Sequence, residues 1–446
     1  MRTHSWPGWP DLLGWGLVLL VLGAQFVDLR HGITRPWLVS LQLVICVAAI
    51  LVAAPVAWRA RPLTSLTRTG TILVGGFTLM EAWALVSSMV SPLAVIRQGV
   101  IPRAYQVVPV LTGWVTMAAV LVVLLALGPR GRRRYLPRAA LALVLGAFAD
   151  WPVQAGIHGS GRLASGMGGS AVLHVALVLA AAVLVDTGLE VAGQRRALWF
   201  AAGGLAVLGT LLTGSRAAFL VVVLVVAVLL VVLGRGAAGR LVRLLAGVGV
   251  VIGALAVVVV PTLHRLTTWQ SPQRLETLRV GWRAVSSSPW TLVFGVGSGS
   301  VFPWYAVEAK LIPVSGDREV ITRFGRALSS AHSVYLEVLT ELGLVMTLVL
   351  AALVIALWTA GLRSLLRWRH GAGGSHERGS QQVWPRGGAV TALAVCATTL
   401  AWAFDTYLVK NFAVSLWWWV VALSAVGLVD DRGRTDDLTD PGSPRP

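Results

Sequence analysis

The chain has 446 residues, of which 56% are hydrophobic and only 13% are charged, and its formal net charge is +18. So little charge in a chain of this length excludes a water-soluble globular protein, because most of the apolar surface has to face lipid or other membrane helices. The two cysteines, Cys46 and Cys396, both lie inside apolar runs and indicate neither a disulfide framework nor a metal site.

Apolar runs of about 17–25 residues predict about twelve membrane-spanning helices, which makes the expected fold an all-α polytopic membrane protein. The first run follows a Trp- and Pro-rich start and has no small-residue cleavage site after it, so we expect a retained span and not a signal peptide. The predicted spans are 11–29, 37–57, 70–91, 107–127, 136–153, 168–186, 197–213, 215–233, 241–260, 333–359, 387–404 and 411–428.

The basic residues are distributed unevenly over the loops between these spans. With the N-terminus inside, the short inner loops carry eighteen Lys or Arg residues and the short outer loops carry seven. This positive-inside bias predicts that both termini are cytoplasmic and that the long loop 261–332, between the ninth and tenth spans, is extracytoplasmic. The positive charge therefore reports membrane topology and does not indicate nucleic-acid binding.

Three of the inward-running spans begin with similar residues at their predicted outer ends. Each start combines Ser, Thr or Gly, which favour helix N-termini, with an arginine or a histidine. Free N–H groups and the positive end of the helix dipole bind anions, and a guanidinium matches the oxygens of a phosphate. The alternative is that the small residues only cap the helices and the arginines extend to the membrane interface. The three starts are Arg162–Ser170, Thr213–Arg216 and Ser329–Ser333.

The long loop 261–332 carries eight Lys or Arg residues against four acids, and it contains a predicted amphipathic helix after Ser271-Pro272. In this helix an apolar stripe is flanked by arginines, which indicates a helix at the membrane surface with its arginines at the depth of lipid phosphates. General binding to lipid headgroups is the alternative. The stripe comprises Leu275, Leu278, Trp282 and Val285, and the arginines are Arg274, Arg279 and Arg283.

A glycine-rich run, Gly295–Ser300, follows this helix. No βαβ unit surrounds the run, so a dinucleotide site is not indicated. We expect a tight turn that brings backbone N–H groups close to a ligand.

In this order, the motifs resemble the O-antigen ligase and O-antigen polymerase superfamily of bacterial membrane glycosyltransferases. The resemblance covers about residues 155–350 and includes His332-Ser333 followed by Gly343, a spacing similar to the histidine motif of the ligases. The other matching motifs are Arg162 with Gly168-Gly169-Ser170, Thr213–Leu220, and Arg279 with Trp282-Arg283, Pro289 and Gly295-Val296-Gly297.

The resemblance implies an all-helical, GT-C-like fold and surface polysaccharide biosynthesis. The implied reaction transfers a glycan from an undecaprenyl-diphosphate donor, on the outer face of the cytoplasmic membrane, to a glycan or lipid-glycan acceptor. It implies no metal and no other cofactor, and it leaves ligase and polymerase both open. We expect membrane helices in 1–154, a catalytic membrane core in 155–360, further membrane helices in 361–428 and a disordered cytoplasmic tail in 429–446.

The chemistry assigns roles to the matching residues. Negative charge develops on the leaving diphosphate, for which Arg216 and Arg279 are the predicted partners. His332, at a positive helix end that favours its neutral form, is the predicted general base for the acceptor hydroxyl. A histidine that only caps or packs is the alternative. Supporting contacts to the diphosphate or glycan are expected from Arg162, Arg274, Arg283 and Ser333.

Acidic residues in or near the spans, Glu81, Asp150 and Asp405, are candidates for function or for pairing with Arg162 or Arg216. The run Trp417–Trp419 is expected at the interface or facing lipid. A transporter or flippase for a lipid-linked oligosaccharide is the alternative function, although its charges should line the midplane. A glycan polymerase of the shape-elongation-division type would depend on an outer-loop aspartate, for which the long loop offers only Asp317.

Overall fold

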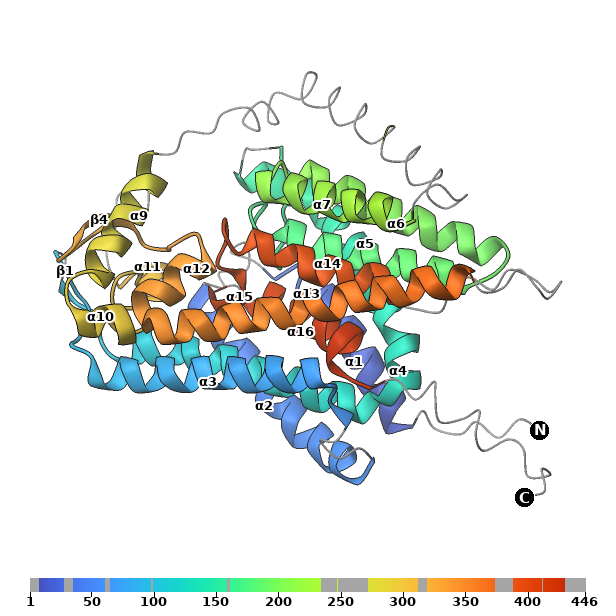
Figure 1. The fold of residues 1–446 in the computed structure, drawn as a ribbon, viewed down its shortest axis with the longest axis horizontal. Coiled ribbons are helices and arrows are strands. Elements are labelled where there is room, and N and C mark those ends of the chain that lie inside the picture. Colours follow the sequence, from blue (N-terminus) through green and yellow to red (C-terminus); the bar gives the residue numbers. More distant parts are fainter. Residues whose placement is uncertain are drawn as a thin grey trace.

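The computed structural model describes residues 8–27, 35–60, 65–97, 99–158, 161–233, 247, 272–311, 319–373, 388–410 and 412–429. These residues are mostly helical, and the long helices run roughly parallel to one another (Figure 1). The long helices are α1 (Trp9–Gly23), α2 (Arg35–Ala60), α3 (Arg68–Val90), α4 (Ala104–His158), α5 (Leu173–Glu190), α6 (Gln194–Leu212), α7 (Arg216–Leu233), α13 (Gly343–Gly373), α14 (Ala389–Ala401) and α16 (Phe412–Ala422).

Among the described residues, five helical segments are long and apolar enough to cross a membrane. They coincide with predicted spans, and shorter apolar helices lie at other predicted spans. These helices confirm the prediction of a mostly helical membrane protein. The predicted span 241–260 lies outside the described residues apart from Gly247. The five segments are Trp37–Arg59, Arg68–Val90, Ala104–Gly156, Leu173–Glu190 and Val334–Trp368.

Helix α4 covers the two predicted spans 107–127 and 136–153. Its helical path breaks at Gly128, where φ is 63° and ψ is 178°, a conformation that glycine adopts without a Cβ clash. The segment 129–135, which the sequence predicts as an inner loop, begins the second half of this helix. Hydropathy locates apolar stretches and gives no sign that this polar connection between two predicted spans is helical.

Shorter elements gather at one end of the long helices, at the left of Figure 1. We call this the site end. Its helices are α9 (Pro272–Val285), α10 (Pro289–Phe294), α11 (Trp304–Glu308), α12 (Val334–Glu337) and α15 (Tyr407–Lys410), and its strands are β1 (Val95–Ile96), β2 (Gly99–Val100), β3 (Glu319–Thr322) and β4 (Gly325–Leu328).

The strands form a small antiparallel sheet in the order β2-β1-β3-β4. Ile96 pairs with Thr322, so the sheet ties the connection between α3 and α4 to the distant loop segment before α12. The sequence predicts no sheet in this region. Strands of two to four residues carry too few positions for an alternating pattern to be read.

The π-helical turns η4 (Val338–Leu342) and η5 (Leu423–Gly427) extend α12 and α16. Residues Val334–Trp368 therefore form one candidate span that contains α12, η4 and most of α13. Single π-turns inside helices occur often at functional sites. Of the two π-helical turns, η4 is the one near His332, from which it is separated in the chain by the short helix α12.

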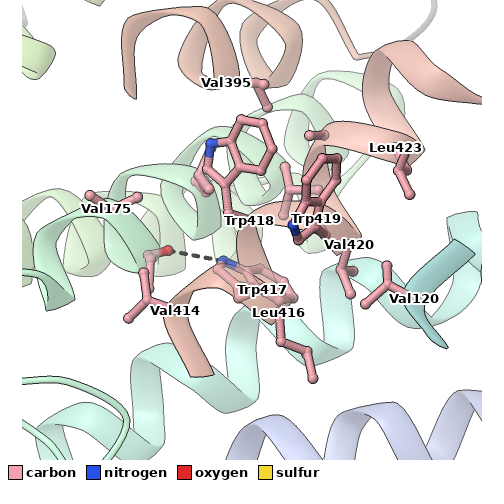
Figure 2. Close-up of a cluster of buried hydrophobic side chains, with 14 of the residues drawn as sticks. Val120, Val175, Val395, Val414, Leu416, Trp417, Trp418, Trp419, Val420 and Leu423 are labelled. Carbon is pink, nitrogen blue, oxygen red and sulfur yellow. Dashed lines mark hydrogen bonds between the residues drawn. The ribbon is translucent and has the colours of Figure 1, made fainter. Parts of the chain in front are cut away.

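The tryptophans of α16 lie in the protein core and do not face lipid (Figure 2). Trp417, Trp418 and Trp419 are almost fully buried among α4, α5 and α14. The indole Nε1 of Trp417 donates to Ala176 O at 3.1 Å, and that of Trp418 donates to Thr398 Oγ1 at 3.0 Å. The predicted interfacial position was wrong because hydropathy cannot distinguish a side chain facing lipid from one facing another helix.

Candidate active site

The turn before α12 holds His332 in a strained backbone conformation. His332 has a φ of 50°, and within the described chain only Lys310 is a second non-glycine residue with a positive φ. Such a conformation is costly for a side chain with a Cβ and persists only where its surroundings enforce it. Ser333 forms the N-cap of α12, where its Oγ accepts the N–H of Leu336 at 3.3 Å.

The surroundings that enforce this turn come from the segment between α14 and α15. The backbone N–H of Val334 donates to Trp402 O at 2.8 Å and to Asp405 O at 3.2 Å. The hydroxyl groups of Ser330 and Thr406 lie 3.2 Å apart. His332 is therefore presented, half-buried, from a turn that is fixed on both sides.

Asp405 is the buried acid of this neighbourhood. Burial raises the pKa of its carboxyl well above the usual range, and the nearby positive charge of Arg274 partly opposes this. The first turn of α9 therefore reaches the segment that holds the His332 turn. The sequence left the role of Asp405 open, and its position next to a predicted span was the signal that marked it.

Helix α9 confirms the amphipathic helix that the sequence predicts, with a different face buried. Its small residues pack inward: Gly281 lies so close to α12 and η4 that an added Cβ would meet Leu336 and Thr340 at 2.9 Å. Most of the predicted apolar stripe points outward, since Leu275, Leu278 and Trp282 are 50%, 52% and 60% exposed. An outward apolar stripe beside arginines suits a helix that lies at a membrane surface.

Arg279 and Arg283 share one partner on α9. Each Nη1 lies 3.3 Å from a carboxylate oxygen of Glu276, and Arg283 Nη1 also donates to Phe324 O at 3.3 Å. Both side chains are more than half exposed. At this exposure, pairing with one carboxylate contributes little to stability and leaves the guanidinium groups accessible.

A groove of about 430 Å³ runs between α9 and the α12–η4 segment. Its walls are almost entirely apolar, and Arg279 and Arg283 belong to its lining. An apolar groove lined in part by two arginines matches an amphiphile that has a hydrocarbon chain and an anionic headgroup. The remaining lining residues are Leu278, Gly281, Trp282, Val285, Leu336, Leu339 and Thr340.

A second cluster joins the other two predicted helix starts. Arg162 Nε donates to Thr213 O at 2.6 Å, and the backbone N–H of Leu163 donates to Leu212 O at 3.0 Å. These bonds hold the segment before α5 against the turn between α6 and α7, where Arg216 begins α7 half-buried. Arg162 and Arg216 thus belong to a cluster built on α5, α6 and α7, whereas the other predicted site residues lie around α9 and α12.

Asp150 fixes the segment before α5. Its Oδ2 accepts from Gln154 Nε2 at 2.8 Å and from the backbone N–H of Gly166 at 3.2 Å. Asp150 therefore anchors the segment that follows Arg162 and leads into α5.

The glycine-rich run holds one of the protein's own carboxylates. Backbone N–H groups of Gly299, Val301 and Phe302 donate to Glu341 at 2.8, 3.2 and 2.9 Å. Of these donors only Gly299 belongs to Gly295–Ser300, and for its N–H the expected approach to a substrate was wrong. The signal in the sequence that could indicate this role is a glutamate placed inside a predicted span.

The spacing from His332 to Gly343 has a structural cause. Gly343 ends η4 with a φ of 81°, and a Cβ there would lie 2.4 Å from Gly295 N. A Cβ on Gly295 would in turn meet Glu341 O at 2.2 Å. Two glycines from distant parts of the chain thus allow the glycine-rich run to touch the turn that follows α12.

Residues 201–351 match the O-antigen ligase family. The matched segment contains Arg216, the described part of the long loop, His332 and the first turns of α13, while Arg162 precedes it. The match confirms the resemblance predicted from the motifs and shows that this part of the chain is similar to the O-antigen ligase family. No curated protein matches the chain.

Proposed function

We propose that the protein transfers or polymerises a glycan from an undecaprenyl-diphosphate donor at the outer face of the cytoplasmic membrane. The observation that carries the proposal is the apolar groove beside the α12–η4 segment, with Arg279 and Arg283 in its lining and His332 before the start of α12. A polyprenyl diphosphate is an amphiphile of the kind that such a groove fits, and the family match supports glycan transfer.

In the proposed reaction, the acceptor hydroxyl oxygen attacks the anomeric carbon of the donor glycan. The bond from that carbon to the diphosphate oxygen breaks, its electrons remain on the diphosphate, and His332 takes the hydroxyl proton. The arginines stabilise the charge that develops on the leaving group, which requires no metal ion. Arg274, Arg283, Arg162 and Ser333 are proposed to position the diphosphate or the glycan.

We propose Asp405 as a residue that positions the His332 turn. Its carbonyl accepts from Val334 N, and its buried side chain interacts with the charge of Arg274. It thereby couples the base to the start of α9.

The orientation rests on the charge bias of the loops, since short arginine-rich segments remain in the cytoplasm. Both termini are accordingly placed inside, and the site end is placed outside. Residues 155–360 are proposed as the catalytic membrane core. The predicted tail 429–446 lies outside the described residues apart from Val429, and it is proposed to be cytoplasmic.

A reconstituted transfer assay with His332→Ala tests the proposal. Loss of a general base should lower the rate about 10²–10⁴-fold while the variant still binds the carrier-linked donor. His264→Ala, in the same predicted loop but outside every motif, is the matched control and should work like wild type. Near-normal transfer by His332→Ala, or an equal loss in His264→Ala, would reject His332 as the general base. Absence of transfer by the wild-type protein would reject the proposed function and favour a transporter of the same lipid.

A further inference from the structure

A second pocket lies on the other side of the α12–η4 segment from the apolar groove. Leu336, Leu339 and Thr340 line the groove, whereas Glu337 and Glu341 line the pocket. The pocket encloses about 50 Å³ between η4, the ends of α3 and α4, the glycine-rich run and α11. One short helical segment that begins just after His332 therefore separates two sites of different character.

The pocket contains a side chain whose hydrogen bonds the protein leaves unmade. Gln106 is 3% exposed, and within the described part of the chain neither its Oε1 nor its Nε2 has a hydrogen-bond partner. Burying an amide in this state is costly, and native proteins rarely do so without a compensating ligand or water. Gln106 can both donate to and accept from a group that enters the pocket.

The other polar groups of the pocket do not suit an anion. Glu81 and Glu337 are buried and close enough to interact electrostatically, and the described residues that line the pocket include no Lys or Arg that could pair with a diphosphate. The described residues also contain no group of three His, Cys, Asp or Glu side chains placed to hold a metal ion. A neutral hydroxyl group fits, because it can donate to a carboxylate or to Gln106 Oε1 and accept from Gln106 Nε2.

Aromatic rings complete the wall of the pocket. The rings of Tyr105 and Tyr305 lie 5.7 Å apart, and Trp304 contacts Tyr305 edge to face at 5.6 Å. All three residues line the pocket. Apolar ring faces beside a few converging polar groups are the usual composition of a small-molecule site.

We propose that this pocket binds hydroxyl groups of a neutral sugar and selects the glycan that the enzyme accepts. This inference rests on the proposed function. The anionic carrier would lie in the groove, on the arginine side of the α12–η4 segment, and the sugar hydroxyls would lie in the pocket, on the glutamate side. A volume of about 50 Å³ holds a few water-sized groups, so the pocket admits a hydroxyl or hydroxymethyl arm while the sugar ring stays in its mouth.

Gln106→Met tests the proposal in the full-length protein, because methionine keeps the side-chain length and removes the amide. The affinity for methyl glycosides, measured over a panel of sugars by saturation-transfer NMR, should be about tenfold lower in Gln106→Met, because the paired hydrogen bonds of the amide are lost. The thermal unfolding temperature without ligand should rise, since an unsatisfied buried amide is removed. Binding of undecaprenyl phosphate should not change.

Arg279→Lys is the matched control and should show the opposite pattern, with weaker binding of undecaprenyl phosphate and unchanged binding of methyl glycosides. The inference is overturned if no methyl glycoside binds the wild type. It is also overturned if Gln106→Met binds the methyl glycosides as well as the wild type does, because water alone would then fill the pocket. A lower unfolding temperature of Gln106→Met would contradict it as well. Failure of the proposed function is seen separately, as absence of glycan transfer by the reconstituted wild-type protein.

Discussion

The two ends of the helix bundle use arginine in different ways. At the arginine-rich end, formed by residues 65–70, 130–138 and 426–429, Arg132 donates to Val429 O at 2.9 Å and Arg138 lies over the rings of Trp15 and Tyr135. At the site end, Arg279 and Arg283 share Glu276 and line an apolar groove. Arginine side chains thus connect neighbouring helices at the arginine-rich end and line a ligand-sized groove at the site end.

The comparison is sharpest for one pair of arginines. Arg134 lies 2.8 Å from Asp11 and is 54% exposed, while Arg279 lies 3.3 Å from Glu276 and is 58% exposed. Exposure and an acidic partner therefore do not distinguish Arg134 from Arg279. The two differ in the groove beside Arg279, which is formed by residues that are distant in the sequence, and the proposed role of Arg279 rests on that groove.

Gly343→Ala should have the largest effect on stability. At Gly343 a Cβ would meet the backbone of the glycine-rich run at 2.4 Å, whereas at Gly388, with a similar φ of 83°, nothing lies within 4 Å. We expect Gly343→Ala to lose about 3–5 kcal/mol, from the clash and the backbone conformation together, and Gly388→Ala about 1 kcal/mol. Thermal unfolding in detergent measures both, and equal losses would show that the contact with Gly295 contributes nothing.

Arg279→Lys should have the next largest effect, on turnover. Lysine keeps the charge but loses the planar fork that matches a diphosphate, so the rate should fall about tenfold, which corresponds to about 1.4 kcal/mol. Arg134→Lys, with a matched exposure and partner at the arginine-rich end, should retain the wild-type rate. If both variants transfer glycan like wild type at unchanged protein level, Arg279 is an interface anchor. Arg216→Lys extends the test to the second cluster.

Metal chelation should have no effect on the rate of glycan transfer. The proposed charge stabilisation comes from arginines and helix N-termini, so transfer measured with EDTA should equal transfer measured without it. Loss of activity with EDTA that Mg²⁺ or Mn²⁺ restores would contradict this.

Hydropathy and capping patterns predicted the membrane helices and α9, because both signals are local in sequence. Residues 272–285 carry a proline at the helix start and an apolar stripe that any surface helix would show. The motif spacing also led to the family that residues 201–351 match.

Contacts between distant segments could not be predicted. The pairing of Ile96 with Thr322 and the clamp of Glu341 on the glycine-rich run join residues far apart in the chain. The burial of Trp417–Trp419 also depends on which helices pack around α16. No pattern in the sequence marks Gln106, because it is a single glutamine near a predicted span.

Cysteine labelling of the two ends in intact cells tests the central claim, that the site end is extracytoplasmic. Ser286, after α9, and Ala192, between α5 and α6, are exposed, while the native Cys46 and Cys396 are buried. With a membrane-impermeant maleimide, Ser286→Cys should label in intact cells and Ala192→Cys only after permeabilisation. Labelling of Ala192→Cys in intact cells, with Ser286→Cys protected, would contradict the orientation and the proposed reaction on the outer face.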